Sequence, residues 1–248
     1  MSSPEQTRAA HRSIPTAAQR WARYRPEEHL VWATLYRRRM SELEHQASRV
    51  YLDGIAAVGI EADLIPDLRS INRRLAPLTG WRAVPVAGYL DAADFFASLA
   101  RRRFPTTVTI RGRESLDYTP APDIFHDVFG HVPLHADPAF AGWLERFAAI
   151  SFARREPGAV ERLARLFWFT VEFGLVRERG EIRVYGSGLI SSAAEARHAL
   201  GPSCERRPFD LAEVLDRRFA IDDLQPVLYV VDDFGQLVEA LDRVDAML

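Results

Sequence analysis

The sequence of 248 residues contains no lysine, one cysteine and no long hydrophobic run. Its 32 strongly basic residues are therefore all arginine, which excludes Schiff-base catalysis by lysine and the lysine of a phosphate-binding P-loop. Cys204 can form no internal disulfide, which favours a reducing, cytoplasmic environment. No apolar run approaches the roughly 20 residues of a membrane helix, and the polar N-terminus lacks the apolar core of a signal peptide.

The charge balance is also close to neutral, with 32 basic and 34 acidic residues. Such a balance predicts no general attraction to nucleic acid or to an anionic membrane. Hydrophobic residues make up 48% of the chain and aromatic residues 10%, enough for a substantial core. Because no repeat or internal linker is evident, we expect a single domain over residues 26–248. Residues 1–25 are polar and are expected to form an N-terminal arm, flexible or docked on that domain.

Apolar residues recur at helical spacing over most of the domain. The expected helices span residues 27–60, 67–81, 92–104, 122–131, 137–155, 158–179, 209–217 and 234–248. The ends of the second, third and fourth of these helices are predicted from helix breakers. These are Pro77 with Gly80 for the second, Pro105 for the third and Pro133 for the fourth. The expected strands are the β-branched run 106–111 and the buried run 225–233, with a strand and turn over 179–189. The predicted fold class is mainly α with a small antiparallel β element.

Three histidines occur in the stretch PDIFHDVFGHVPLH, residues 122–135. Burying imidazoles among such apolar neighbours costs free energy unless each finds a partner, and a shared metal ion is one such partner. His126 and His131 are five residues apart and would lie about 140° apart around an ideal α-helix. They converge only if one of them lies where the helix ends.

Gly130 and Pro133 predict such a helix end beside His131. His131 and His135 have the alternative four-residue spacing, but Pro133 lies between them and breaks the helix that would align them. We therefore favour His126 and His131 as the ligand pair and expect His135 at the rim of the site.

A third ligand is indicated by Glu172 in the stretch LFWFTVEFGLV, residues 166–176. A helix that is apolar on all sides is buried, and a buried carboxylate is costly unless it is paired or bound to metal. A salt bridge to Arg165 or another arginine is the alternative. Two histidines and one carboxylate suit non-heme iron(II) with open coordination positions. The HExxH pattern of zinc proteases is absent, whereas the pair His126–Asp127 keeps an HD-type phosphohydrolase open.

Several longer motifs resemble those of the pterin-dependent aromatic amino acid hydroxylases. They are TPAPDIFHDVFGHVPLHADPAFA, WFTVEFGLV and YGSGLISS, with further similarity in PVAGYLDAADFF, RRRFPTTVTIR and LQPVLYVV. The resemblance covers roughly residues 26–248 and is strongest to the short bacterial phenylalanine 4-monooxygenases. It implies the catalytic-domain fold of that family, without the regulatory domain or oligomerisation helix of animal relatives, and a monomer. It also implies iron(II), a tetrahydropterin and dioxygen, with a free amino acid as substrate and no nucleic-acid or membrane partner.

The resemblance also implies roles for individual residues. Iron would be held by His126, His131 and Glu172. The substrate would be bound by Arg111, Thr119, Pro122, Asp123, Trp168, Phe173, Gly188 and Ser191. Among these, the planar guanidinium of Arg111, supported by Asp123, suits the substrate carboxylate. Ser191 would in addition orient His126.

The same resemblance implies that the pterin lies against Phe95, the backbone of Leu90 and Asp127, with Tyr118 at the site entrance. The sequence departs from the family pattern at Ala121, His135 and Phe167, none of which is an expected ligand. Trp168 favours phenylalanine as the substrate, by resemblance to the phenylalanine enzymes.

The expected reaction is therefore hydroxylation of L-phenylalanine to L-tyrosine. Within the same family, hydroxylation of tryptophan or of phenylalanine at the meta position is an alternative. A zinc-type or HD-type hydrolase built on His126, Asp127 and His131 is an alternative from another class. A helical binding protein without activity is a further one, although such a scaffold has no reason to bury Glu172.

Overall fold

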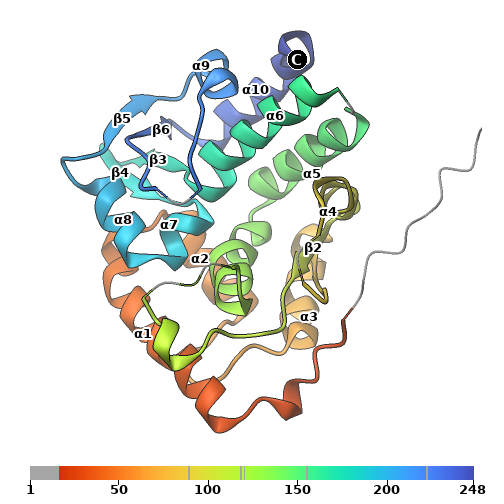
Figure 1. Ribbon diagram of the computed structural model, residues 1–248, viewed down its shortest axis with the longest axis vertical. Helices are drawn as coiled ribbons and strands as arrows, with labels where there is room; N and C mark the ends of the chain where they lie inside the picture. The colour runs from red at the N-terminus through yellow and green to blue at the C-terminus, as the bar shows by residue number, and fades with distance from the viewer. Residues whose placement is uncertain (1–16, 89, 118, 120, 155, 222) are drawn as a thin grey trace, which may run out of the picture.

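The structure, a computed structural model, describes residues 17–248 apart from residues 89, 118, 120, 155 and 222. Helices form most of it, and two small sheets pack against them (Figure 1). The described part of the expected arm lies against the domain. The Gln19 amide donates to the Pro66 carbonyl at 2.8 Å, and the Trp21 indole N–H donates to the Ile65 carbonyl at 2.6 Å.

The helical elements include two π-helices among the α-helices and 3-10 turns. The α-helices are α1 (Pro26–Gln46), α2 (Arg49–Val58), α3 (Leu68–Thr79), α4 (Ala92–Leu99), α5 (Pro138–Ala153), α6 (Pro157–Phe167), α7 (Ser187–Ser191), α8 (Ala193–Leu200), α9 (Leu211–Asp216) and α10 (Phe234–Met247). The π-helices are η3 (Phe125–His131) and η5 (Trp168–Glu172), and the 3-10 helices are η1 (Trp21–Arg23), η2 (Arg113–Ser115) and η4 (Val132–Ala136).

The expected helix over residues 27–60 is divided into α1 and α2. The backbone is extended at Ala47 and Ser48, and the Ser48 hydroxyl accepts a hydrogen bond from the backbone N–H of Tyr51 at the start of α2. The expectation that Pro77 ends the next helix is wrong, because Pro77 lies inside α3. The other expected breaker, Gly80, does end that helix, since its left-handed conformation (φ 79°) lets its N–H donate to the Ala76 carbonyl.

The expected strand over 106–111 is misplaced, and the structure has two strands in this region. α4 ends at Leu99, and Arg102 turns the chain with φ 55° into β2 (Arg103–Thr106). β2 pairs in parallel with β1 (Arg82–Pro85), which the sequence pattern did not reveal. Pro105 therefore lies within a strand rather than ending a helix. A two-stranded sheet has only edge strands, which tolerate a proline.

The second sheet has the strand order β4-β3-β6-β5. β3 (Leu175–Glu178) and β4 (Glu181–Val184) form an antiparallel hairpin, as expected for this element. β6 (Val227–Val231) pairs in parallel with β3 and with β5 (Glu205–Pro208), so the antiparallel description holds for the hairpin alone. The expected helix over 158–179 was too long, because the helical path ends at Glu172 and β3 follows.

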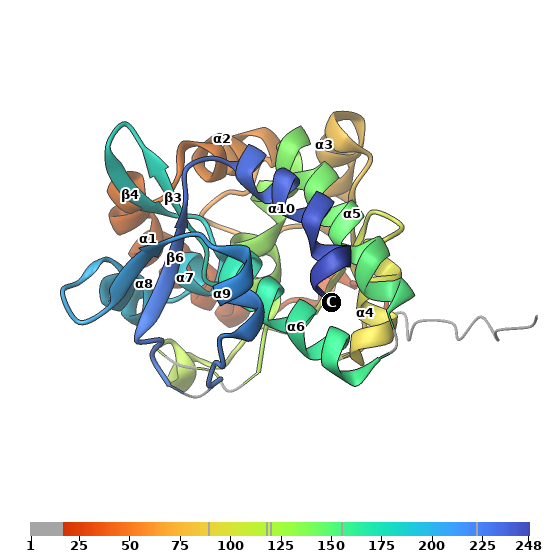
Figure 2. The same cartoon turned by 90° about the horizontal axis from the view of Figure 1, so that it is seen from above.

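A continuous core joins the helices to the second sheet. Its largest fully buried side chains include Trp32, Trp81, Trp143 and Tyr229. The closing helix α10 lies along α5 (Figure 2). All five residues of β6 are buried. No helix among the described residues is both long enough and apolar enough to span a membrane.

The packing of α2 against η4 depends on Gly54. A Cβ atom at this position would overlap the backbone carbonyl of Pro133. We predict that Gly54→Ala lowers the free energy of unfolding by about 2 kcal/mol, because overpacking outweighs the better helix propensity of alanine. Urea denaturation measures the change. Gly142→Ala in α5 is the matched control, since a Cβ there meets nothing within 4 Å. Equal stability of the two variants would contradict the prediction.

Candidate functional site

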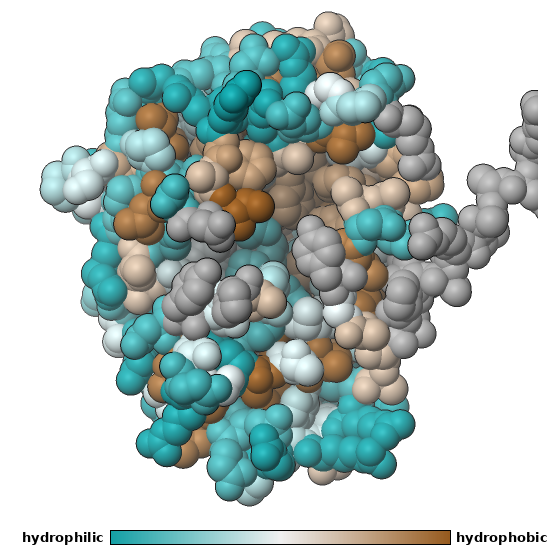
Figure 3. Space-filling model, in the orientation of Figure 1, coloured by the Kyte–Doolittle hydropathy of each residue, from teal (hydrophilic) through white to brown (hydrophobic). Residues whose placement is uncertain are grey.

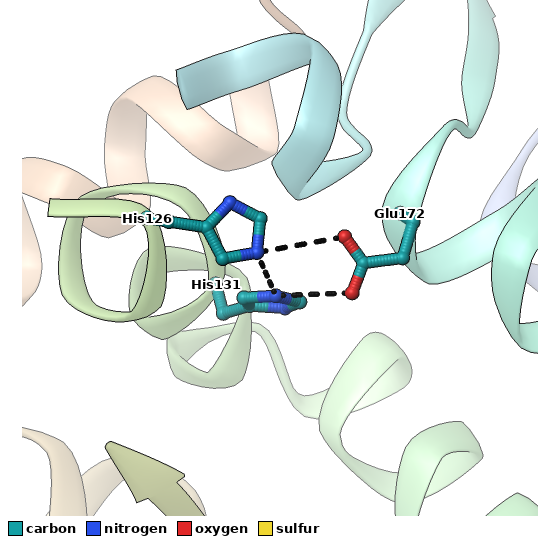
Figure 4. Close-up of side chains that lie close together, drawn as sticks. All are labelled: His126, His131 and Glu172. Carbon is teal, nitrogen blue, oxygen red and sulfur yellow. Dashed lines mark hydrogen bonds and ion pairs between the residues drawn. The ribbon is translucent and has the colours of Figure 1, made fainter. Parts of the chain in front are cut away.

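Two π-helical turns bring the three expected ligands together. In a π-helix each N–H bonds to the carbonyl five residues before it, so residues five apart lie near each other. η3 contains both His126 and His131, which explains their unusual spacing, and Glu172 is the last residue of η5. Figure 4 shows the three side chains pointing toward one another from these two segments. A helix end was therefore the wrong reason for expecting the histidines to converge, although the pair was correctly chosen.

The ligand atoms are separated by distances that fit a metal ion. Nε2 of His131 lies 3.2 Å from Nε2 of His126 and 3.3 Å from Oε1 of Glu172, and Nε2 of His126 lies 3.6 Å from Oε2 of Glu172. Two ligand atoms bound at about 2.1 Å and at right angles would be about 3 Å apart. In the part of the chain that the structure describes, no fourth histidine, cysteine or acidic residue joins the cluster. This donor set suits non-heme iron(II) with open positions.

The charge states of the ligands also suit a metal. Burial alone would raise the pKa of the Glu172 carboxyl, but the nearby His131 and His126 and a hydrogen bond from Ser187 outweigh it and lower the pKa to about 2. Burial lowers the pKa of His126, which favours its neutral form. An ionised carboxylate and a neutral imidazole are the forms that bind metal.

Helix α7 supplies hydroxyl groups to two of the ligands. The Ser191 hydroxyl lies 2.9 Å from Nδ1 of His126, as expected from the sequence, so a proton on Nδ1 leaves Nε2 free for a metal. The Ser187 hydroxyl donates to Oε2 of Glu172 at 2.7 Å. Sequence reasoning missed Ser187, since no spacing within YGSGLISS relates it to Glu172.

The competing interpretations of the ligands are not supported by their contacts. Arg165 donates to Glu161 and to the Leu215 carbonyl rather than to Glu172. Asp127 is not part of the ligand cluster. Its Oδ2 accepts a hydrogen bond from the backbone N–H of Thr107 at 2.7 Å, so the HD pair does not form a metal-binding unit.

The prediction that His135 lies at the rim is wrong. The helical path continues beyond Pro133 as the 3-10 turn η4, which places His135 behind His131 with 1% of its surface exposed. Its Nδ1 lies 2.9 Å from the His131 carbonyl, and its ring packs against Trp81 and Phe104. Burial lowers the pKa of His135 to about 3, so its imidazole is neutral.

Arg111 and Asp123 form a buried ion pair beside the ligands. Nε and Nη2 of Arg111 donate to the two carboxylate oxygens of Asp123 at 2.8 and 2.9 Å. Oδ1 of Asp123 also accepts the backbone N–H of His126 at 3.1 Å, which connects the pair to the ligand turn. Burial would raise the pKa of Asp123, but its bonds with Arg111 outweigh this and lower it. Two of the five guanidinium N–H groups are used in this pair, and the other three have no hydrogen-bond acceptor among the described residues.

Aromatic rings border the site on the η5 side. The rings of Trp168 and Phe173 are 4.7 Å apart, and a Cβ added at Gly188 would lie 3.0 Å from the Phe173 ring. Phe219, between α9 and β6, stacks on Trp168 at 4.4 Å with 14° between the planes. Sequence reasoning missed Phe219 because it lies in a segment without periodicity, 51 residues beyond Trp168 and outside the quoted motifs.

The other expected substrate residues lie on the loop before η3. Pro122 is exposed, and the Thr119 hydroxyl donates to the Ala121 carbonyl at 3.1 Å. Tyr118, expected at the entrance, lies outside the described residues.

Of the residues expected to bind pterin, Asp127 lies in η3 itself, Phe95 in α4 and Leu90 just before α4. Phe95 in α4 is half-buried and contacts Phe104, whose ring lies 4.7 Å from that of His131. Leu90 is buried just before α4. The side chains of His126 and Glu172 are 18% and 16% exposed, so the ligand cluster is open on one side. The surface seen in Figure 3 has a hollow near its middle that is bordered largely by hydrophobic residues.

Comparison with known proteins agrees with this geometry. Residues 13–247 match the model of the biopterin-dependent aromatic amino acid hydroxylase family. The chain is 41% identical to a phenylalanine-4-hydroxylase of Chromobacterium violaceum, covering 88% of this chain and 74% of the relative. It is 42% identical to that of Caulobacter vibrioides, covering 90% and 76%.

A solved structure of the Chromobacterium violaceum phenylalanine hydroxylase contains iron(III) and 7,8-dihydrobiopterin. It has a TM-score of 0.89 at 40% identity and covers 94% of this chain and 86% of that one. The fold, the ligand cluster and the matched motifs lead to one conclusion: the chain belongs to the biopterin-dependent aromatic amino acid hydroxylases.

Proposed function

We propose that this protein is an iron(II)- and tetrahydropterin-dependent monooxygenase that converts L-phenylalanine to L-tyrosine, with residues 26–248 as its catalytic domain. The observation that carries the proposal is the cluster of His126, His131 and Glu172, in which His126 and Glu172 keep 18% and 16% of their side chains exposed. The phenylalanine hydroxylases among its relatives support the choice of substrate.

The protein's own groups would bind and orient the reactants. When bound, iron(II) would activate dioxygen and the tetrahydropterin would supply two electrons, so that one oxygen atom enters the ring and the other leaves at the oxidation level of water. His126, His131 and Glu172 would hold the metal through one side and leave its other positions open. Trp168 and Phe173 would enclose the substrate ring and exclude water from it.

Further residues would position the amino acid and the pterin. The free N–H groups of Arg111 would bind the substrate carboxylate, with Asp123 holding the guanidinium in place. Thr119, Pro122, Gly188 and Ser191 would complete the amino acid site. Phe95 would stack on the pterin, with the Leu90 backbone and Asp127 at the edge of its ring.

The direct test supplies the iron(II)-loaded protein with phenylalanine, a tetrahydropterin and air. We expect para-tyrosine by chromatography and mass. Glu172→Ala should lower iron content and rate by more than the roughly 10- to 100-fold caused by losing an outer partner of a ligand. Glu239→Ala, on the exposed face of α10, is the control and should change neither.

The product separates the remaining possibilities within the family. Meta-tyrosine would contradict the proposed ring position, and pterin oxidation with product from tryptophan alone would contradict the substrate. A protein that holds iron but consumes neither pterin nor amino acid would contradict the hydroxylase proposal itself.

Arg111→Lys tests the carboxylate site. Lysine keeps the charge but loses the planar fork, so we expect KM for phenylalanine to rise about tenfold or more, in line with roughly 1.5–3 kcal/mol for a hydrogen bond to a charged group. Phenethylamine, which lacks the carboxylate, is the matched ligand. Its inhibition constant (Ki), measured with phenylalanine as the varied substrate, should be almost unchanged by the substitution. Equal weakening of both ligands would show that Arg111 does not bind the carboxylate.

Phe219→Ala tests the aromatic wall that sequence reasoning missed. Trp168 loses its stacked neighbour, and such a pair contributes about 0.5–1.5 kcal/mol, so we expect KM for phenylalanine to rise roughly 2- to 10-fold. Ile221→Ala is the control in the same segment, because that side chain is 75% exposed. An unchanged KM in both variants would exclude a role for Phe219 in the pocket.

The monomeric state and the cytoplasmic location predicted from the sequence stay predictions. Light scattering of the purified protein tests the first, and fractionation of the cells that produce it tests the second.

A further inference from the structure

Helix α7 is too short to hold its own position, although two of the ligands depend on it. It has five residues, far fewer than an isolated helix needs for stability in water. Its first residue, Ser187, donates to Glu172 and its last, Ser191, contacts His126. A shift of α7 would therefore move the hydrogen-bond partners of a carboxylate and an imidazole together.

Arg39 contacts the C-terminal end of α7, although it lies about 150 residues earlier in the chain. Nε of Arg39 in α1 donates to the Ile190 carbonyl at 2.8 Å, and Nη2 donates to the Leu189 carbonyl at 3.1 Å. Carbonyls in the last turn of a helix have no partner within the helix. Arg39 thus satisfies two of these carbonyls with one rigid, planar group, and α1 and α7 lie in contact (Figure 1).

Burial distinguishes Arg39 from the arginines next to it. Arg37 and Arg38 have side chains that are 59% and 56% exposed, whereas that of Arg39 is 3% exposed. A buried guanidinium is costly unless its donors are used. Nη1 of Arg39 donates to Glu42 at 2.9 Å, and Glu42 also pairs with Arg197 of α8 at the surface. Each of the three guanidinium nitrogens therefore donates a hydrogen bond, and two of these bonds are directed at α7.

We propose that Arg39 is a positioning residue of the metal site, which holds the carbonyl end of α7 and through it the serine hydroxyls that orient His126 and Glu172. Arg39 touches neither the metal ligands nor the bound reactants. Its effect is transmitted by α7, and its removal should lower metal affinity while leaving the fold in place. This inference deepens the proposed function and rests on the same ligand cluster.

The test measures the dissociation constant for cobalt(II) by chelator competition, without substrate or pterin. Loss of a group that orients a ligand typically weakens metal binding about 10- to 100-fold. Because Arg39 acts one step further away, we expect about a tenfold loss for Arg39→Met. Arg39→Lys keeps the charge but cannot span both carbonyls in the same way, so its affinity should be intermediate. If Arg39→Met does not fold, the Arg39→Lys variant still tests the proposal.

Two controls separate positioning from general effects. Arg38→Met removes the exposed neighbour in α1, and Arg197→Met removes the surface end of the ion-pair network without touching α7. Both should bind cobalt within twofold of the unaltered protein. The cobalt absorption bands should shift in the Arg39 variants alone, because they report ligand geometry.

A double-mutant cycle tests the route through α7. If Arg39 acts through the serine hydroxyls, Ser191→Ala combined with Arg39→Lys should lose less affinity than the product of the two single losses. Independent, multiplicative losses would overturn the proposal, as would cobalt binding within twofold in a folded Arg39 variant. Because this measurement needs no turnover, failure to hydroxylate phenylalanine would contradict the proposed function and leave this result unaffected.

Discussion

The structure depends on the close approach of one carboxylate and two imidazoles in a largely buried place. Glu172 lies within 3.3–3.6 Å of the two histidine nitrogens, and such a cluster is unfavourable without compensation, because buried polar groups lose their water. The Ser187 hydroxyl donates to Glu172, Nδ1 of His126 donates to Ser191, and a bound metal ion would supply the rest of that compensation. Much of the surrounding architecture, including the two π-helical turns and the short helix α7, can be understood as the means of holding these three side chains at this separation.

The ligand set was predictable from the sequence for an energetic reason. A carboxylate such as Glu172 inside an all-apolar segment requires a partner whatever the local fold is. Its apolar neighbours in the sequence therefore identified Glu172 as a candidate ligand. The motifs then placed the chain in its family, with the matching fold. The π-helical turns were not predictable from periodicity, because η3 and η5 have only seven and five residues, too few for π spacing to be distinguished from α spacing.

The predictions that were wrong elsewhere share a different cause. Contacts between segments distant in the sequence decided the local structure there. Proline was expected to end helices, yet Pro77 lies inside α3 and Pro105 inside β2, where neighbouring elements decide the conformation. The short parallel strand β1 carries little signal of its own. Phe219 stacks on Trp168 and Arg39 bonds to α7, in both cases from a distant segment, and no local pattern in one sequence can reveal such pairings. A run of three arginines predicts a solvated face, whereas its third member is buried.

The π-helical turn η3 has a consequence for how this site tolerates change. His126 and His131 face the same point because four residues lie between them in a π-helical turn. The identity of those four residues does not set this direction. A substitution at Val128 or Phe129 alters packing but keeps that number, whereas the deletion of one residue converts a five-residue spacing into a four-residue spacing and allows an ordinary α-helical turn in its place. Residues four apart also share one face of an α-helix, so the two imidazoles would stay together, but the shorter turn would shift them relative to Glu172 and Ser191, which lie on other segments. During divergence, the length of η3 would therefore be constrained together with its buried side chains.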